Sequence, residues 1–296
     1  MPAAEIRPAL SATETELLAA YNEQADAVRT LNATVTMTPV AGSAYSGVIE
    51  EYHEVGGFVL AARPAMIRVI GQAPVVSKDI FDMVSDGRTF HIFVPSKNKF
   101  LVGSTAIERP TANPIENLRP QHILEAFFWP AVPAGSPVLF EEFDAPPARF
   151  YVLALVRTAG SGLELVRKIW FDRSDLRVSR VQIYGPGGRL DSDIAYSQWQ
   201  AVTSAAPGSG STSPSMFFPR EIRISRPQQD YRLTLSITKL ALNTEISADR
   251  FELAQPPGTE LTRVGGDPPA EEPPNPGQQR PAEGRPSESS RPEERE

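Results

Sequence analysis

The chain has 296 residues, 41% of them hydrophobic, and a formal net charge of −7 from 36 acidic and 29 basic residues. This hydrophobic content supports a sizeable core, and the lack of a basic surplus argues against a nucleic-acid partner. There is no cysteine, which excludes disulfides, thiol catalysis and cysteine-ligated zinc. No apolar run is long enough to span a bilayer.

The N-terminal residues 1–10 lack apolar periodicity, and we expect them to be disordered. Met1–Arg7 has none of the apolar stretch that defines a signal peptide. An exported protein would therefore have lost its signal before Met1, together with any lipid-anchoring cysteine.

A helix is predicted next. Ser11–Glu14 and Thr13–Glu16 are overlapping capping boxes, which mark helix starts. Apolar residues then recur at helical spacing: Leu17, Leu18, Tyr21, Ala25, Val28 and Leu31.

Strands follow the helix. Alternating or β-branched patterns predict strands at 34–39, 45–54, 58–62, 66–70, 79–85, 89–94 and 100–103. Asp86-Gly87 lies between two of these stretches and is a strong hairpin signal.

Prolines then interrupt the strand series and predict a helical insertion. Pro120 suits the first position of a helix, and Pro130 ends it. An apolar stripe lies between them: Ile123, Leu124, Phe127 and Phe128.

The second half is again rich in strands, predicted at 138–143, 149–158, 163–172, 176–184, 190–199, 220–225 and 231–243. The alternation in the last stretch changes phase near Lys239, which indicates a β-bulge. Residues 205–215 read as a flexible loop. Residues 264–296 are rich in Pro and Glu and are expected to be a disordered tail. One mainly β domain, residues 11–263, remains.

Several strands are apolar on both faces. Phe150, Val152, Ala154 and Val156 alternate with Tyr151, Leu153 and Leu155. Phe90, Ile92 and Val94 form one stripe of another strand that also carries Phe93. Two interpretations stay open, because full cores and apolar pockets use the same residues. Either both faces are packed, or one face lines a hollow that holds acyl chains.

Motifs in a fixed order carry a family resemblance. Arg63-Pro64 precedes the Asp86-Gly87 hairpin, and the following strand ends at Pro95. Phe171–Val178 and Asp249–Leu253, the latter followed by Pro256-Pro257-Gly258, extend the series. Over about residues 14–262 the chain resembles the LolA/LolB-type lipoprotein carriers.

The resemblance implies an α+β, mainly β fold: an open antiparallel β-barrel of about eleven strands, with a strand at Asp249–Leu253 near its end. An N-terminal amphipathic helix and a helical lid would cover its concave face. It also implies that Arg63 latches the lid by hydrogen bonds, and that a set of apolar side chains binds lipid: Phe90, Ile92, Val94, Ile123, Phe127, Val152, Leu153 and Leu155. Ala62 departs from the pattern, because soluble members often have a basic residue there.

The implied function is non-enzymatic: a periplasmic monomer that holds lipoprotein acyl chains or phospholipid for transfer to the outer membrane. An inner-membrane exporter or an outer-membrane acceptor would be its further partners. A soluble shuttle and a lipid-anchored form both stay open. The alternative is a periplasmic sensor or protein-interaction domain of the cell envelope.

No residue pattern favours catalysis, a metal or a cofactor. His53, His91 and His122 lie on different predicted elements, and strand alternation separates His53 from the neighbouring glutamates. Asp191 and Asp193 share a strand face, but no base or nucleophile motif accompanies them. Neither a phosphate-binding loop nor a dinucleotide fingerprint is present.

Overall fold

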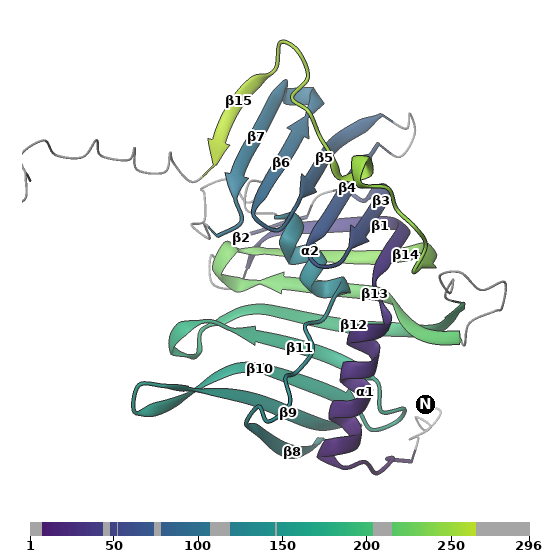
Figure 1. Ribbon diagram of the computed structural model, residues 1–296, viewed down its shortest axis with the longest axis vertical. Coiled ribbons are helices and arrows are strands. Elements are labelled where there is room, and N and C mark those ends of the chain that lie inside the picture. The colour runs from purple at the N-terminus through teal and green to yellow at the C-terminus, as the bar shows by residue number, and fades with distance from the viewer. Residues whose placement is uncertain are drawn as a thin grey trace, which may run out of the picture. The chain divides into compact units, whose positions relative to one another are not determined.

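The computed structural model describes residues 8–43, 48–51, 53–73, 78–106, 119–145, 147–203 and 215–264 (Figure 1). The chain divides into two units, residues 1–265 and 266–296. The second unit lies outside the described residues, and so do residues 205–214 of the predicted loop, whose last residue, Ser215, begins a strand. The prediction of a disordered tail therefore stays a prediction.

Two α-helices are described. In α1, Glu14–Ala27, the Thr13 hydroxyl accepts from Glu16 N–H at 3.3 Å, and the Glu16 carboxylate accepts from Thr13 N–H at 2.8 Å. This is the second of the two predicted capping boxes. The helix is shorter than its apolar spacing predicts, because Val28 is its C-cap and Leu31 belongs to the first strand. In α2, Pro120–Phe127, Pro120 takes the predicted first position.

Fifteen strands are present among the described residues. They are β1 Thr30–Ser43, β2 Val48–Glu51, β3 Val55–Ala62, β4 Met66–Gln72, β5 Asp79–Ser85, β6 Thr89–Val94, β7 Lys99–Ser104, β8 Val138–Ala145, β9 Ala148–Ala159, β10 Gly162–Asp172, β11 Val178–Tyr184, β12 Leu190–Thr203, β13 Ser215–Arg226, β14 Tyr231–Leu242 and β15 Glu260–Val264. The prediction of about eleven strands is therefore wrong.

All fifteen strands belong to one sheet, in the order β15-β7-β6-β5-β4-β3-β1-β14-β13-β12-β11-β10-β9-β8, with β2 paired only to β1. Every pairing is antiparallel except that of β15 with β7, which is parallel. No pairing joins β8 to β15 among the described strands, so the sheet is open, as predicted. One of the strands that was not predicted is β15. It adds to the free edge of β7 and has little apolar alternation of its own, so no sequence pattern indicates it.

Both helices pack on the same face of the sheet, which we call the helix face. Leu17 and Tyr21 of α1 and Ile123 of α2 share one buried cluster with the alternate residues of the strands, such as Leu153 and Ile169. The remaining strand residues point to the opposite face, which we call the back face. No helix among the described residues is long and apolar enough to cross a membrane.

Local signals are confirmed at two places. Gly87 has a φ of +90° in the hairpin turn, where the Asp86 carboxylate accepts from Arg88 N–H at 2.7 Å and Thr89 N–H at 2.8 Å. The bulge predicted near Lys239 is present, because Thr34 pairs with Lys239 but Val35 pairs with Ile237.

One local expectation is wrong. The family resemblance implies a strand at Asp249–Leu253, but Ala248–Phe251 forms a short 3₁₀ helix, η5. Residues 248–259, which we call the strap, have no strand partner because they cross the back face instead of extending an edge. The strand that follows is β15.

Candidate functional site

Arg63 ties the helices to the sheet. It follows β3, and its guanidinium donates to three main-chain carbonyls: Val28 at 2.9 Å, Ala25 at 2.7 Å and Trp129 at 3.0 Å. Ala25 and Val28 lie at the C-terminal end of α1, where carbonyls lack helical partners, and Trp129 follows α2. The guanidinium also lies 5.0 Å from the centre of the Phe128 ring. The Arg63–Pro64 peptide bond is cis.

The charge of Arg63 is held in a partly desolvated place. Burial lowers the pKa of its guanidinium, while the negative charge of Asp26 opposes that shift. Arginine keeps its proton in proteins, so the residue stays a cation with several donors directed at the covering segments. The contacts expected from the resemblance are present, and their role as a latch stays a prediction.

A second group of polar contacts joins α1 to the segment after α2. The Tyr21 hydroxyl donates to Pro130 O at 3.2 Å, and Arg167 of β10 donates to the same carbonyl at 2.9 Å. Asn22 donates to Val132 O at 3.0 Å and accepts from Val132 N–H at 2.8 Å. Burial raises the pKa of Tyr21, so this hydroxyl stays neutral and can donate.

Aromatic rings surround these contacts. Tyr21 stacks on Trp129 with ring centres 5.3 Å apart, and Tyr196 meets the same indole edge-on at 5.3 Å. Trp129 Nε1–H donates to the Tyr196 hydroxyl at 2.8 Å, and that hydroxyl donates to Ala126 O at 3.1 Å. Trp199 lies 6.2 Å from Trp129. The polar groups of this aromatic cluster are thus satisfied by one another, and its rings provide apolar contact surface.

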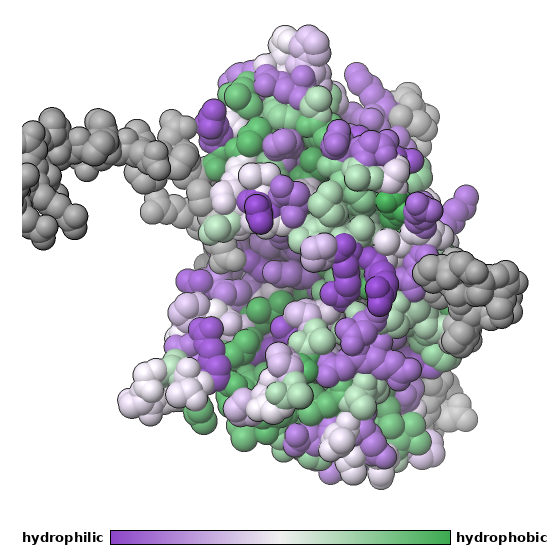
Figure 2. Space-filling view, viewed as in Figure 1, coloured by the Kyte–Doolittle hydropathy of each residue, from purple (hydrophilic) through white to green (hydrophobic). Residues whose placement is uncertain are grey.

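A cavity of about 460 Å³ opens beside this cluster, between α1 and strands β10, β12 and β13. We call it the helix-face cavity. Its lining is mainly aromatic and apolar, including Tyr21, Trp129, Phe171, Trp199 and Phe217, with Glu23, Gln24, Arg177 and Asn243 as its polar and charged members. Its volume is within the range of roughly 300–1,000 Å³ that is usual for small-molecule sites. Hydrophobic side chains gather in the lower half of Figure 2, where α1 crosses these strands.

A much smaller void of about 10 Å³ lies next to Arg63. Gln24 and Trp129 border both this void and the helix-face cavity. Phe127 and Phe218 line its far side with rings 6.4 Å apart. Gln24 and Trp129 therefore lie between the open cavity and the void beside Arg63.

The residues proposed from sequence to bind lipid are mostly inside the packed core. The structure brings together Phe90 and Ile92 of β6, Ile123 and Phe127 of α2, and Leu153 and Leu155 of β9 in the buried cluster of the helix face. Val94 is half-buried against it. Val152 is fully buried but points to the back face, by strand alternation from Leu153.

The helix-face cavity is lined by residues that sequence reasoning did not select for binding. The apolar patterns of the sequence give no binding role to Trp129 or Trp199, and they assign Tyr21 only to a helix stripe. One signal was available: the run Phe127-Phe128-Trp129-Pro130 places three aromatic rings at a helix end. The contribution of Phe217 depends on the pairing of β13 with β12, which the sequence does not show.

His122 anchors α2 from a buried position. Its Nδ1 lies 2.5 Å from the hydroxyl of Tyr231 on β14, and the two rings are stacked at 5.9 Å. Burial, together with the positive charges of Arg226 and Arg119, lowers the pKa of His122 well below its ordinary value. Burial raises the pKa of Tyr231. The pair is therefore neutral at pH 7 and serves as a hydrogen-bonded anchor.

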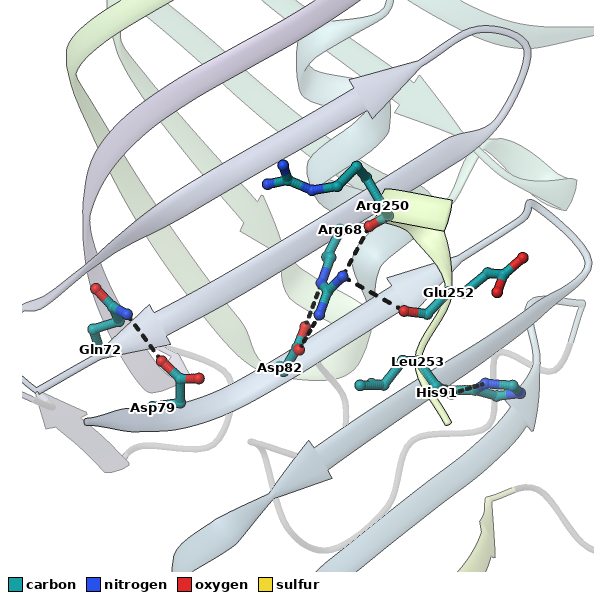
Figure 3. Close-up of polar contacts among 8 residues, drawn as sticks. All are labelled: Arg68, Gln72, Asp79, Asp82, His91, Arg250, Glu252 and Leu253. Carbon is teal, nitrogen blue, oxygen red and sulfur yellow. Dashed lines mark hydrogen bonds and ion pairs between the residues drawn. The ribbon is translucent and has the colours of Figure 1, made fainter. Parts of the chain in front are cut away.

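The strap is held on the back face by side chains of β4 and β6 (Figure 3). Arg68 forms a two-point ion pair with Asp82, at 2.7 and 3.0 Å, and donates to Arg250 O at 3.0 Å. His91 Nδ1 lies 3.3 Å from Leu253 O. His91 thus contributes to a main-chain contact and not to a group of catalytic side chains.

The described side chains show no metal centre. No group of three or more acidic, histidine or cysteine residues among them is arranged to hold an ion, and His53 is exposed. Asp191 and Asp193 each pair with an arginine, Arg189 at 3.0 Å and Arg180 at 2.6 Å respectively. Both carboxylates are therefore engaged in ion pairs with neighbouring arginines.

No protein-family model and no curated protein matches the chain. Similar solved structures include a DUF1329 family protein from Desulfovibrio piger, with a TM-score of 0.49 and 12% identity over 79% of this chain and 94% of that chain. A LolA superfamily protein from Nitrosomonas europaea has a TM-score of 0.45 and 15% identity over 82% and 99%. A domain named for outer-membrane lipoprotein sorting, from Vibrio parahaemolyticus, has a TM-score of 0.45 and 10% identity over 81% and 97%. At this similarity they assign no function to the chain.

Proposed function

We propose that the protein binds acyl chains, of lipoprotein or phospholipid, between the helix face of its sheet and helix α1. Helix α1 and the segment after α2 together form a cover over the helix face. The observation that carries the proposal is the way Arg63 holds this cover. One guanidinium joins main-chain carbonyls of α1 and of the segment after α2 beside a large apolar core. Such a cover can detach without breaking a covalent or strand connection.

Entry of a ligand would exchange hydrogen bonds for apolar burial. An intramolecular hydrogen bond contributes about 1 kcal/mol net, and burial of each methylene contributes about 0.8 kcal/mol. About four methylenes would thus roughly offset the three bonds of Arg63. The helix-face cavity provides the entrance, because it shares Gln24 and Trp129 with the void beside Arg63.

The setting of the activity is also a proposal. The motifs from Arg63-Pro64 to Pro256-Pro257-Gly258 support a periplasmic carrier that delivers its lipid to the outer membrane without catalysing a reaction. The residues expected to line the site, such as Phe90 and Leu153, would become lining only after α1 moves. In the closed arrangement they are core residues.

A matched pair of substitutions on α1 tests the site. Ala20 lines the helix-face cavity, whereas Ala19 is exposed on the same helix outside that lining. After removal of co-purified lipid, the protein is titrated with a fluorescent diacyl lipopeptide. Ala20→Trp is expected to weaken binding about tenfold by filling the cavity, and Ala19→Trp is expected to bind like the parent.

Two results would contradict the proposal. One is a parent protein that takes up no lipopeptide and releases no lipid on extraction with organic solvent. The other is equal binding by the two tryptophan variants, which would move the site away from α1. Circular dichroism of both variants checks that the helix is retained.

A further inference from the structure

A second open cavity lies on the back face of the sheet, where neither helix packs. It is a groove of about 620 Å³ whose lining extends from Phe143 on β8 to Val40 on β1. Its two ends differ in chemistry: aromatic rings over β8–β10, and the arginines Arg223 and Arg232 over β13 and β14. We call it the back-face groove.

Three rings form the aromatic end. Trp170 meets Phe143 and Phe150 edge-on, with ring centres 5.6 Å and 5.7 Å away. Phe143 is 38% exposed although it is a large hydrophobic residue. Trp170 Nε1–H donates to Gln182 at 3.0 Å, so the indole is fixed in place and presents an apolar surface with no unsatisfied donor. Val152, fully buried, lies on this face on the neighbouring strand, paired with Trp170.

Arg223 and Arg232 form the basic end, whereas Arg180, whose guanidinium lies 5.8 Å from the centre of the Trp170 ring, is between the two ends. Arg180 is paired with Asp193 and Arg223 with Glu221. Among the described residues no carboxylate forms an ion pair with Arg232, whose side chain is exposed. The Arg223 side chain is 65% exposed, and exposed pairs contribute little stability. Arg223 and Arg232 can therefore turn toward an anionic ligand at little cost.

Strand register sets the separation of the two ends. Trp170 pairs with Arg180, Arg180 with Ala195, and Ala195 with Arg223. Adjacent strands are about 4.8 Å apart, so Trp170 and Arg223 are separated by roughly 14 Å across the groove. A free anion cannot contact both ends. A ligand that does so must be elongated, apolar along its length and anionic at one terminus.

We propose that the back-face groove binds a single-chain lipid with a phosphate head group. The alkyl chain lies against Trp170, Phe150 and Phe143, and the phosphate accepts hydrogen bonds from Arg223 and Arg232. The small residues Ser179 and Ala195 line the groove between the two ends and leave room for the chain. This site is independent of the proposed acyl site, which is on the helix face.

The positions of the tryptophans provide a test. The chain has three: Trp170 lines the back-face groove, whereas Trp129 and Trp199 line the helix-face cavity. The full-length protein is labelled with 5-fluorotryptophan, and Trp170→Phe assigns the ¹⁹F resonance of Trp170. Titration with monomeric dodecyl phosphate is expected to shift that resonance saturably, whereas inorganic phosphate and the uncharged dodecyl maltoside leave it in place.

The arginines have a matched control. Arg223→Gln combined with Arg232→Gln is expected to raise the Kd for dodecyl phosphate about tenfold, as loss of charge-assisted hydrogen bonds requires. Arg189→Gln removes a similarly exposed arginine outside the groove lining and is expected to change the Kd less than twofold.

Three results would overturn this proposal: an unmoved Trp170 resonance, equal shifts with dodecyl maltoside or inorganic phosphate, or unchanged affinity in the double variant. If dodecyl phosphate shifts only Trp129 and Trp199, the back-face site fails while the acyl site on the helix face is supported. If only Trp170 responds, the back-face site is supported and the acyl site on the helix face is not. The two proposals can therefore fail separately.

Discussion

Two arginines fasten two covers onto opposite faces of the same sheet. Arg63 holds α1 and the segment after α2 on the helix face, and Arg68 holds the strap on the back face. Both donate to main-chain carbonyls. They differ in their anchoring: Arg68 has a carboxylate partner, Asp82, whereas no ion pair is found for Arg63 among the described residues. We therefore expect the strap to stay in place and α1 to be the cover that is released.

The two halves of the back face also differ. Over β4–β7 the strap crosses the sheet, and the apolar residues there, such as Val84 and Phe100, are 4% and 3% exposed. Over β8–β14 no described segment crosses the face, and Phe143 is 38% exposed. Strands that are apolar on both faces occur in both halves of the sheet. Their back face is covered by the strap over β4–β7, and it forms an open groove over β8–β14.

The largest expected effect tests this difference directly. Phe100→Ala should lower the free energy of unfolding by about 3–5 kcal/mol, because a covered aromatic side chain leaves a cavity. Phe143→Ala should cost about 1 kcal/mol, the value of an exposed aromatic pair. Urea unfolding measures both. Equal losses would mean that the back face is covered in both halves.

The second-largest effect is expected for the cover on the helix face. Arg63→Leu removes the donor of three carbonyls, which predicts a loss of about 3 kcal/mol with the sheet intact and α1 more open. Hydrogen exchange should speed up in residues 14–28. Arg29→Leu is the control, since the neighbouring Arg29 is exposed and only its main chain takes part in the contacts seen. Unchanged exchange in Arg63→Leu would show that the arginine is not a latch.

The corresponding change on the back face is Arg68→Met. It breaks the pair with Asp82 and the hydrogen bond to Arg250 O, so a loss of about 2 kcal/mol is expected. Faster exchange should be confined to residues 248–264. Arg250→Met keeps the accepting carbonyl and should behave like the parent. Faster exchange across α1 as well would contradict the independence of the two covers.

Much of this arrangement could be predicted from local patterns. The capping box at Thr13, the turn at Asp86-Gly87 and the bulge near Lys239 depend on residues close in sequence, and all three are present. The covers depend on distant contacts: Arg68 meets Arg250 across 182 residues. No pattern in the strap shows that it crosses a sheet, and therefore a strand was predicted there.

The binding residues show the same limit. Alternation correctly separated Leu153 and Leu155 from Val152, but it could not say which face a helix covers. It also could not distinguish a filled interior from a hollow one, because both need the same apolar side chains. The helix-face cavity lies where helix, strand ends and turns meet, at Trp129 and Trp199. Those meeting points are set by tertiary structure alone.

Acid should weaken the α2 part of the cover. His122 is buried beside Tyr231, with Arg226, Arg119 and Glu125 as the charged groups around it. Its pKa is lowered in the folded state, so the unfolded chain takes up a proton that the folded chain does not. The stabilisation that this site contributes is fully present above pH 6.5, the ordinary pKa of histidine. It declines as the pH falls below that value.

Urea unfolding between pH 7.5 and 5 measures the effect. His122→Asn should flatten the decline with pH, although it costs some stability at pH 7.5. His53→Asn changes an exposed histidine and should leave the decline unaltered. An identical pH dependence in the parent and His122→Asn would show that other groups cause it.

The smallest effect is expected from the C-terminal tail. Residues 266–296 are rich in Pro and Glu and lack apolar periodicity, so they offer little surface that burial could stabilise. A chain that ends at Gly265 keeps β15 and its pairing with β7, and its Tm should match the parent within about 2 °C. A chain that ends at Gly258 removes β15 and should melt clearly lower, because the edge of β7 loses its partner. If the first truncation lowers the Tm as much as the second, the tail contributes to folding and is a third cover of the sheet besides α1 and the strap.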